Sequence, residues 1–155
     1  SNTSVGVAAM GDNSTGSLNT AVGRTALKSN STGSQNTAIG YGALFSNTTT
    51  DNNTAVGYSC GYSNTTGGIE AFGYAALEAN TTGYANVAMG NQALKLNTTG
   101  GYNTAIGREA LEANTTGSYN SAYGVEALRS NTTASNNTAV GYKAGYSTTT
   151  AASST

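Results

Sequence analysis

The chain has 155 residues, of which 37% are hydrophobic and only 8% are charged, with 21 glycines and no proline. An ordinary enzyme domain needs more apolar side chains to fill its core, and a disordered chain usually carries more charge or proline than this chain, whose net charge is −1. Nucleic-acid binding and membrane insertion are not expected either. The six Lys and Arg residues form no basic stripe, and no apolar run reaches the roughly 18 residues that a bilayer helix needs.

A repeat runs through the whole chain and decides the expected fold. A triplet of small residue, apolar residue and glycine marks its phase, and the marker glycines are Gly6, Gly23, Gly40, Gly57, Gly73, Gly90, Gly107, Gly124 and Gly141. The markers are evenly spaced, except that the interval between Gly57 and Gly73 is shorter than the others because one residue has been lost in a turn. Such internal periodicity is typical of stacked repeats and predicts a solenoid.

Each unit begins with a short predicted strand. The consensus opens with Asn-Thr-Ala-Val-Gly-Tyr, in which Thr, Val and Tyr share one strand face and Ala and Gly the other. A second short strand is expected at the following Ala-Leu pair, and the next run, Asn-Thr-Thr-Gly, predicts a tight corner. The sequence therefore predicts an all-β, parallel β-solenoid (β-roll) of about nine 17-residue coils over residues 1–150, with residues 151–155 as a terminal tail or linker.

Columns of equivalent residues indicate which side chains face inward. Alanines such as Ala21 and Ala38 form one column and leucines such as Leu27 another, so the coil interior is thin. The residue after each column alanine is larger and apolar, and burying it needs a second surface. We expect that surface to be another copy of the chain, with a trimer favoured. The residues concerned are Val22, Ile39, Val56, Phe72, Met89, Ile106 and Val140.

Five boxes of the form Asn-Thr-Ala-(Val/Ile)-Gly lie at 19–23, 36–40, 53–57, 103–107 and 137–141. They resemble the repeats of trimeric autotransporter adhesin heads, and they are similar to repeats of bacteriophage tail-fibre and related surface-fibre proteins. The resemblance covers nearly the whole chain. It implies a left-handed parallel β-roll in a homotrimer that acts as a shaft or adhesive head.

The sequence offers little for catalysis. It has no His, and its seven acidic residues show no paired spacing at a recurring position. Cys60 replaces an alanine of an interior column and has no His partner, so we expect a buried, inert thiol. We predict that the protein is not an enzyme and that it binds no cofactor or metal.

One asparagine per coil opens an Asn-x-Thr triplet, the acceptor pattern for N-glycosylation, at a predicted exposed corner. The column comprises Asn13, Asn30, Asn47, Asn64, Asn80, Asn97, Asn114 and Asn131, and further matches are Asn2, Asn52 and Asn136. If these residues carry sugars, the chain forms an N-glycan-coated microbial filament, which is the alternative function. A purely structural interpretation is also open, because stacked asparagines form amide ladders.

The chain has ten tyrosines, which is a high number for a sequence with so few hydrophobic residues. Tyr102 and Tyr119 form a pair at a corner, and exposed aromatic rings stack on sugars, so these two residues are candidate contacts to a receptor glycan. Strand packing or burial between chains is the interpretation that we favour for the tyrosines in general.

Regular threonine rows can also match an ice lattice, which makes ice binding a minor alternative. Pairs such as Thr48 and Thr49 fall in predicted corners rather than at alternating strand positions, and this weakens the idea. The main expectation is a structural repeat segment of a surface fibre, located outside a cell, on a cell surface or on a virion.

Overall fold

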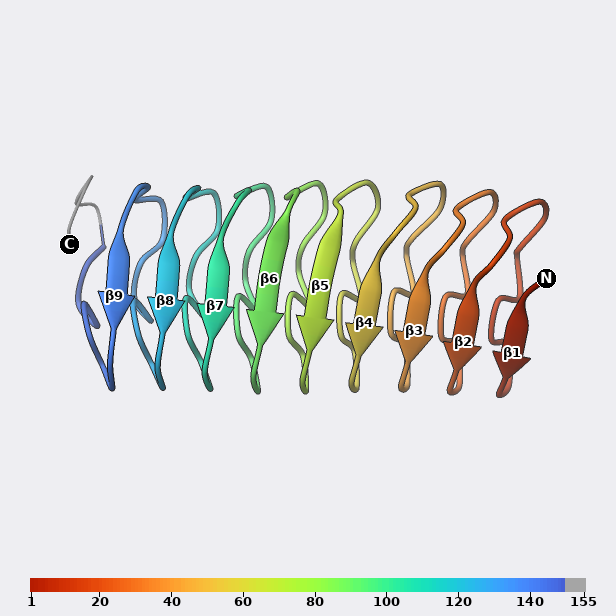
Figure 1. The fold of residues 1–155 in the computed structure, drawn as a ribbon, viewed down its shortest axis with the longest axis horizontal. Helices are drawn as coiled ribbons and strands as arrows, with labels where there is room; N and C mark the ends of the chain where they lie inside the picture. The colour runs from red at the N-terminus through yellow and green to blue at the C-terminus, as the bar shows by residue number, and fades with distance from the viewer. Residues whose placement is uncertain (150–155) are drawn as a thin grey trace.

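The computed structural model describes residues 1–149, which form a rod of stacked coils (Figure 1). Within these residues nine parallel strands form one sheet in sequence order. Their bounds are β1 Thr3–Val5, β2 Thr20–Val22, β3 Thr37–Ile39, β4 Thr54–Val56, β5 Ile69–Phe72, β6 Asn86–Met89, β7 Thr104–Ile106, β8 Ser121–Tyr123 and β9 Thr138–Val140. The predicted all-β parallel solenoid is confirmed, with the strands bounding about eight complete turns. The tail suggested at 151–155 lies outside the described residues.

The period of the sequence sets the register of the sheet. Ala38 of β3 pairs with Ala55 of β4, one full repeat later, and Ala55 pairs with Ala71 of β5 across the shortened repeat. The lost residue is absorbed in the corner between Gly67 and Ile69, so the alanine column continues without a step. Figure 1 shows the strands following one another along the rod in an even row.

The segment after each strand is a series of tight turns, so the second strand predicted at the Ala-Leu pair is wrong. In the coil that begins at β2, Thr25 and Leu27 have φ angles of 57° and 51°. The Thr25 N–H donates to the carbonyl of Val7 in the preceding coil, and the Leu27 N–H donates to the carbonyl of Ala43 in the next coil, both at 2.9 Å. The turns therefore continue the hydrogen bonding between coils without forming a strand.

The interior of a typical coil holds two alanines, one leucine and two asparagines. In the coil of β7 the strand residue Ala105 and the turn pair Ala110 and Leu111 are 0% exposed, as are Asn103 and Asn114. The thin apolar interior was predicted. Its polar half was not, because the asparagines were assigned to exposed corners.

The coil between β4 and β5 departs from this pattern in two places that compensate each other. Gly61 stands where most coils have the interior leucine, and Ile69 stands where the others have an asparagine. A Cβ on Gly61 would lie 2.7 Å from Cδ1 of Ile69, so the isoleucine fills the space that the absent leucine leaves. Close packing of the interior is therefore preserved across the irregular coil.

Candidate functional site

The outer face of the sheet carries the residues that were predicted to meet another chain. The apolar column consists of Val5, Val22, Ile39, Val56, Phe72, Met89, Ile106, Tyr123 and Val140. These side chains point outward because the alanine before each of them, or Ser4 in β1, points inward. In the isolated chain Val22 and Val56 are half-buried, and the other members are exposed, from 37% for Ile106 to 72% for Val140. Coverage of this column by a second chain stays a prediction.

Threonines form a second column on the same face, two residues before the apolar column. Thr20, Thr37 and Thr54 belong to it, but Glu70 and Val87 interrupt it at β5 and β6. The threonine array on this face is therefore interrupted, and ice binding stays a minor prediction.

The asparagines of the Asn-x-Thr column are buried, so the prediction that they lie at exposed corners is wrong. Asn13 is half-buried, and the others, Asn30, Asn47, Asn64, Asn80, Asn97, Asn114 and Asn131, are 0% exposed. In a typical rung, Asn97 Nδ2 donates to Asn80 Oδ1 at 2.7 Å and to the Gly100 carbonyl at 2.9 Å. Its Oδ1 accepts from Asn114 Nδ2 at 2.8 Å. The reason for burial is that corner carbonyls face inward and need donors that water does not supply there.

A second asparagine in most coils completes the corner, and the sequence analysis did not identify its role. The Asn103 N–H donates to Asn86 Oδ1 at 2.9 Å, and Asn103 Nδ2 donates to the Gly117 carbonyl at 2.9 Å. The two asparagine columns together form the amide ladder that the structural interpretation expected. An N-linked sugar on the Asn-x-Thr column would replace a hydrogen of Nδ2 that already serves as a buried donor. Glycosylation stays a prediction, and the folded geometry at these positions opposes it.

The second residue after each of these asparagines is an exposed threonine. The exposed threonine row consists of Thr15, Thr32, Thr49, Thr66, Thr82, Thr99, Thr116 and Thr133. The residue before it is bound to the rod, as where Thr98 Oγ1 donates to the Thr115 carbonyl at 3.0 Å. The residue directly before the second asparagine differs from coil to coil. It is exposed at Gln35, Asn52 and Tyr102.

The tyrosines proposed as glycan contacts lie together on one corner of the rod. Tyr102 and Tyr119 are 54% and 59% exposed, and their rings stack with centroids 5.0 Å apart and planes 2° apart. Tyr84, which the sequence analysis did not single out, meets Tyr102 edge-on at 6.1 Å and is 57% exposed. We call Tyr84, Tyr102 and Tyr119 the corner tyrosines.

The shortened corner between Gly67 and Ile69 opens a pocket of about 380 Å³ in the surface of the rod. Flanking coils have two residues at this place, and the second of them has a positive φ, as at Asn52 (60°) and Ala85 (54°). In the shortened corner only Gly68 occupies this place, so residues of the two neighbouring corners border an open space. The lining includes Asp51, Asn52, Glu70 and Tyr84, none of which the sequence analysis selected for such a site. The signal that could have found them is the single shortened interval between marker glycines.

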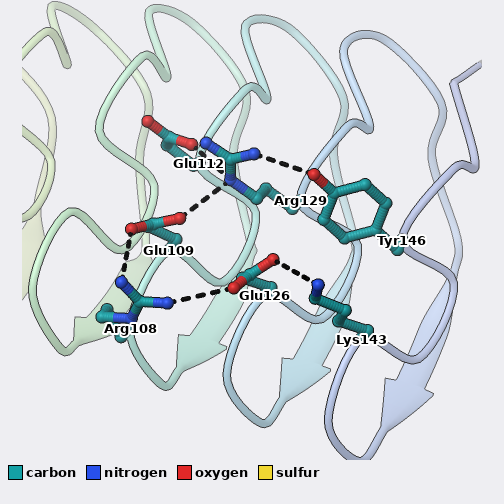
Figure 2. A network of polar contacts seen from close by, with 7 residues as sticks. All are labelled: Arg108, Glu109, Glu112, Glu126, Arg129, Lys143 and Tyr146. Atoms are coloured by element: carbon teal, nitrogen blue, oxygen red, sulfur yellow. Dashed lines mark hydrogen bonds and ion pairs between the residues drawn. The ribbon is translucent and has the colours of Figure 1, made fainter.

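A network of ion pairs and hydrogen bonds joins successive coils on the turn side of the rod (Figure 2). It comprises Arg108, Glu109, Glu112, Glu126, Arg129, Lys143 and Tyr146. Nε of Arg129 lies 3.0 Å from the Glu109 carboxylate and 2.8 Å from that of Glu112, and its Nη1 donates to the Tyr146 hydroxyl at 2.9 Å. The hydrogen bond to Tyr146 raises the pKa of the Arg129 guanidinium above its ordinary value.

The second branch of the network centres on Glu126, which is 9% exposed. Its carboxylate lies 3.0 Å from Arg108 of the preceding coil and 3.6 Å from Lys143 of the next coil. Three cations and three carboxylates therefore balance across the network, which leaves no net charge for a ligand. We interpret it as a clamp between coils, in which each pair contributes little because its cation is partly exposed.

Residues suited to catalysis are not brought together in the described part of the chain. Cys60 is 0% exposed, as predicted, and burial raises the pKa of its thiol to about 12, so it stays protonated. Among residues 1–149 no three His, Cys, Asp or Glu side chains lie close enough to hold a metal ion. The same residues include no helix that could span a membrane.

Comparison of the chain with protein-family models, with curated proteins and with solved structures found no match. Functional inference therefore depends on the rod itself, on the apolar column, and on the pocket with the corner tyrosines.

Proposed function

We propose that this chain is a structural repeat segment, a shaft or adhesive head, of a fibre displayed outside a cell or on a virion. The observation that carries the proposal is the continuous rod, in which every coil is hydrogen-bonded to the next through both strands and turns. A rod of this kind provides length and stiffness rather than turnover. Its only cysteine is buried and inert.

The location is tested with antibodies raised against the chain and gold-labelled electron microscopy of the source organism or its viruses. We expect label along filaments on the outer surface or on virion appendages. Label confined to the cell interior would contradict the proposal.

The finer arrangement that we propose is a left-handed roll in a homotrimer, with the apolar columns of three chains facing one another. Support comes from the row of outward apolar residues, since an unpaired apolar stripe this long on a rod in water normally meets a partner. The like residues of three identical chains can meet around one axis, as closed symmetric assembly requires.

We expect native mass spectrometry to give three times the 15.4 kDa chain mass. Ile106→Glu places a charge within the apolar column and should convert trimers to monomers, because burying an unpaired carboxylate is costly. The control Thr99→Glu, in the exposed threonine row, should leave the trimer intact. A wild-type protein that stays monomeric at micromolar concentration would rule out the trimer.

A glycan-coated filament is the second candidate. The buried asparagine column disfavours the N-linked form predicted from the sequence, whereas the exposed threonine row favours an O-linked form. Its eight hydroxyl-bearing residues are exposed, whereas the asparagines two residues before them are buried, except the half-buried Asn13. The same mass measurement on protein from its natural source distinguishes a glycan-coated filament from a bare one. Mass above the bare chain, mapped by peptide analysis to these threonines or to the exposed Asn52 and Asn136, supports this candidate, and the bare mass removes it.

A further inference from the structure

The pocket at the shortened corner differs from every regular corner that the structure describes, and its lining has a definite chemical character. Asp51 and Glu70 contribute carboxylates, Asn52 an amide and Tyr84 an aromatic ring with a hydroxyl. No Lys or Arg is among the lining residues. The pocket therefore offers hydrogen-bond acceptors and one aromatic face, and it disfavours anions.

The carboxylates are available to a ligand. One oxygen of Asp51 accepts the Ser34 N–H at 2.6 Å, which fixes the side chain in place and leaves its second oxygen free to accept from a ligand. Glu70 replaces a threonine of the sheet face, is exposed, and takes part in no ion pair among the described residues. Ionised carboxylates only accept hydrogen bonds, so the matching ligand is rich in hydroxyl donors.

The aromatic side of the pocket extends along the rod. A Cβ on Gly68 would lie 3.0 Å from Cε2 of Tyr84, so this ring leans over the shortened corner. Tyr84 in turn contacts Tyr102, and Tyr102 stacks on Tyr119. The corner tyrosines thus form a platform that begins at the pocket and continues over the next two coils. Because the Tyr102 and Tyr119 rings cover one face of each other, the row presents mainly ring edges and hydroxyl groups, and the hydroxyls can donate hydrogen bonds to a sugar and accept them from it.

We propose that the pocket binds one unit of a neutral oligosaccharide, with the corner tyrosines carrying the units that follow. The volume of about 380 Å³ lies at the lower end of the range of small-molecule sites, roughly 300–1,000 Å³. The hydroxyls of the first sugar donate to Asp51 and Glu70, and acidic sugars are excluded by the same carboxylates. The pocket residues Glu70 and Val87 lie near the start of β5 and β6, whereas the apolar column lies at the end of these strands.

This inference adds a ligand to the proposed surface fibre, and its biological meaning rests on that proposed function. The binding itself is measured on the purified wild-type assembly. The probes are arrayed neutral oligosaccharides of hexoses and N-acetylhexosamines, beside sialylated and uronate-containing ones, followed by titration of the best ligand. We expect neutral ligands to bind and acidic ones not to bind. No binding, or binding of acidic glycans alone, would overturn the inference, while gold label on a surface fibre would still support the proposed function.

Variants locate the site. Glu70→Gln should weaken binding about tenfold, the loss expected for one charge-assisted hydrogen bond, and the exposed control Asp12→Asn should not. Changing Tyr102 and Tyr119 together to Ser should weaken longer oligosaccharides only, with Tyr41→Ser as the matched control on another face. Retained binding of the longer oligosaccharides in the double variant would overturn the role of the platform.

The sharpest variant restores the regular corner. Inserting one asparagine between Gly68 and Ile69 gives this coil the same length as its neighbours and should close the pocket. We expect sugar binding to disappear while the circular dichroism spectrum and the oligomeric mass stay unchanged. Full affinity in a folded insertion variant would show that the pocket is not the site.

Discussion

Gly107→Ala is expected to destabilise the rod by about 2 to 6 kcal/mol, because two separate costs fall on this residue. Gly107 has a φ of +137°, a backbone conformation that residues with a Cβ rarely adopt. A Cβ there would also lie 2.5 Å from the carbonyl carbon of Gly124 and 3.0 Å from the amide nitrogen of Val125 in the next coil. The coils must separate or tilt to accept it, and the urea midpoint of the circular dichroism signal should fall accordingly.

Gly141 separates the two costs. It has a similar φ of +125°, but no atom lies within 4 Å of a Cβ built on it. Gly141→Ala should therefore lose only the backbone part, at most about 1 to 3 kcal/mol. Equal midpoints for the two variants would show that contact between coils does not explain the marker glycine.

The repeat period of the sequence is sufficient to predict most of the fold. Once the marker glycines are aligned, strand pairs such as Ala38 with Ala55 follow, and so does the direction of each side chain in the strand. The shortened interval was also assigned to a turn, where the structure has it. Stacking identical segments leaves little freedom, so one correct alignment fixes many contacts at once.

The turn segments could not be predicted in the same way, because their backbone is unusual for their residues. Leu27, Leu44 and Leu111 each have a φ of 51°, a left-handed conformation that costs a leucine about 1–2 kcal/mol. Burying the side chain offsets this with roughly 1.5–3 kcal/mol. One signal was present in the sequence. Adjacent Ala and Leu cannot both face inward in a strand, so their joint burial already argues for a turn.

The asparagines were misplaced for a related reason. Asparagine is common at exposed turns, and the sequence does not show whether corner carbonyls face outward or inward. Here they face inward, and Asn97 and Asn103 serve carbonyls of the interior. The acceptor pattern Asn-x-Thr thus coincides with a structural requirement for a buried amide followed by a residue bonded to the next coil.

Asn97→Ala should destabilise the rod by about 3 kcal/mol or more, because the change leaves Asn80 Oδ1 without its donor and takes one of two acceptors from Asn114 Nδ2. Each buried polar group left without a partner costs about 1–3 kcal/mol, and the alanine leaves a small void as well. Asn91→Ala, at an exposed asparagine one turn segment earlier, should change stability by less than about 0.5 kcal/mol. Equal urea midpoints for these two variants would contradict a stabilising ladder.

Asn97→Asp tests the hydrogen bonds without creating a void, because the side chains have the same shape. A carboxylate at this position would be fully buried and would face Asn80 Oδ1, an acceptor, where Asn97 now presents a donor. Burial and the opposing acceptor both raise the pKa of this carboxyl group in the folded rod above the unfolded value of about 3.9. The folded state then binds more protons than the unfolded state, so stability must fall as pH rises above about 4 and recover as pH is lowered. We therefore expect Asn97→Asp to approach the wild-type urea midpoint at about pH 4 and to fall well below it at about pH 7. A deficit that is the same at both pH values would mean that position 97 is not sealed from water, which the ladder requires.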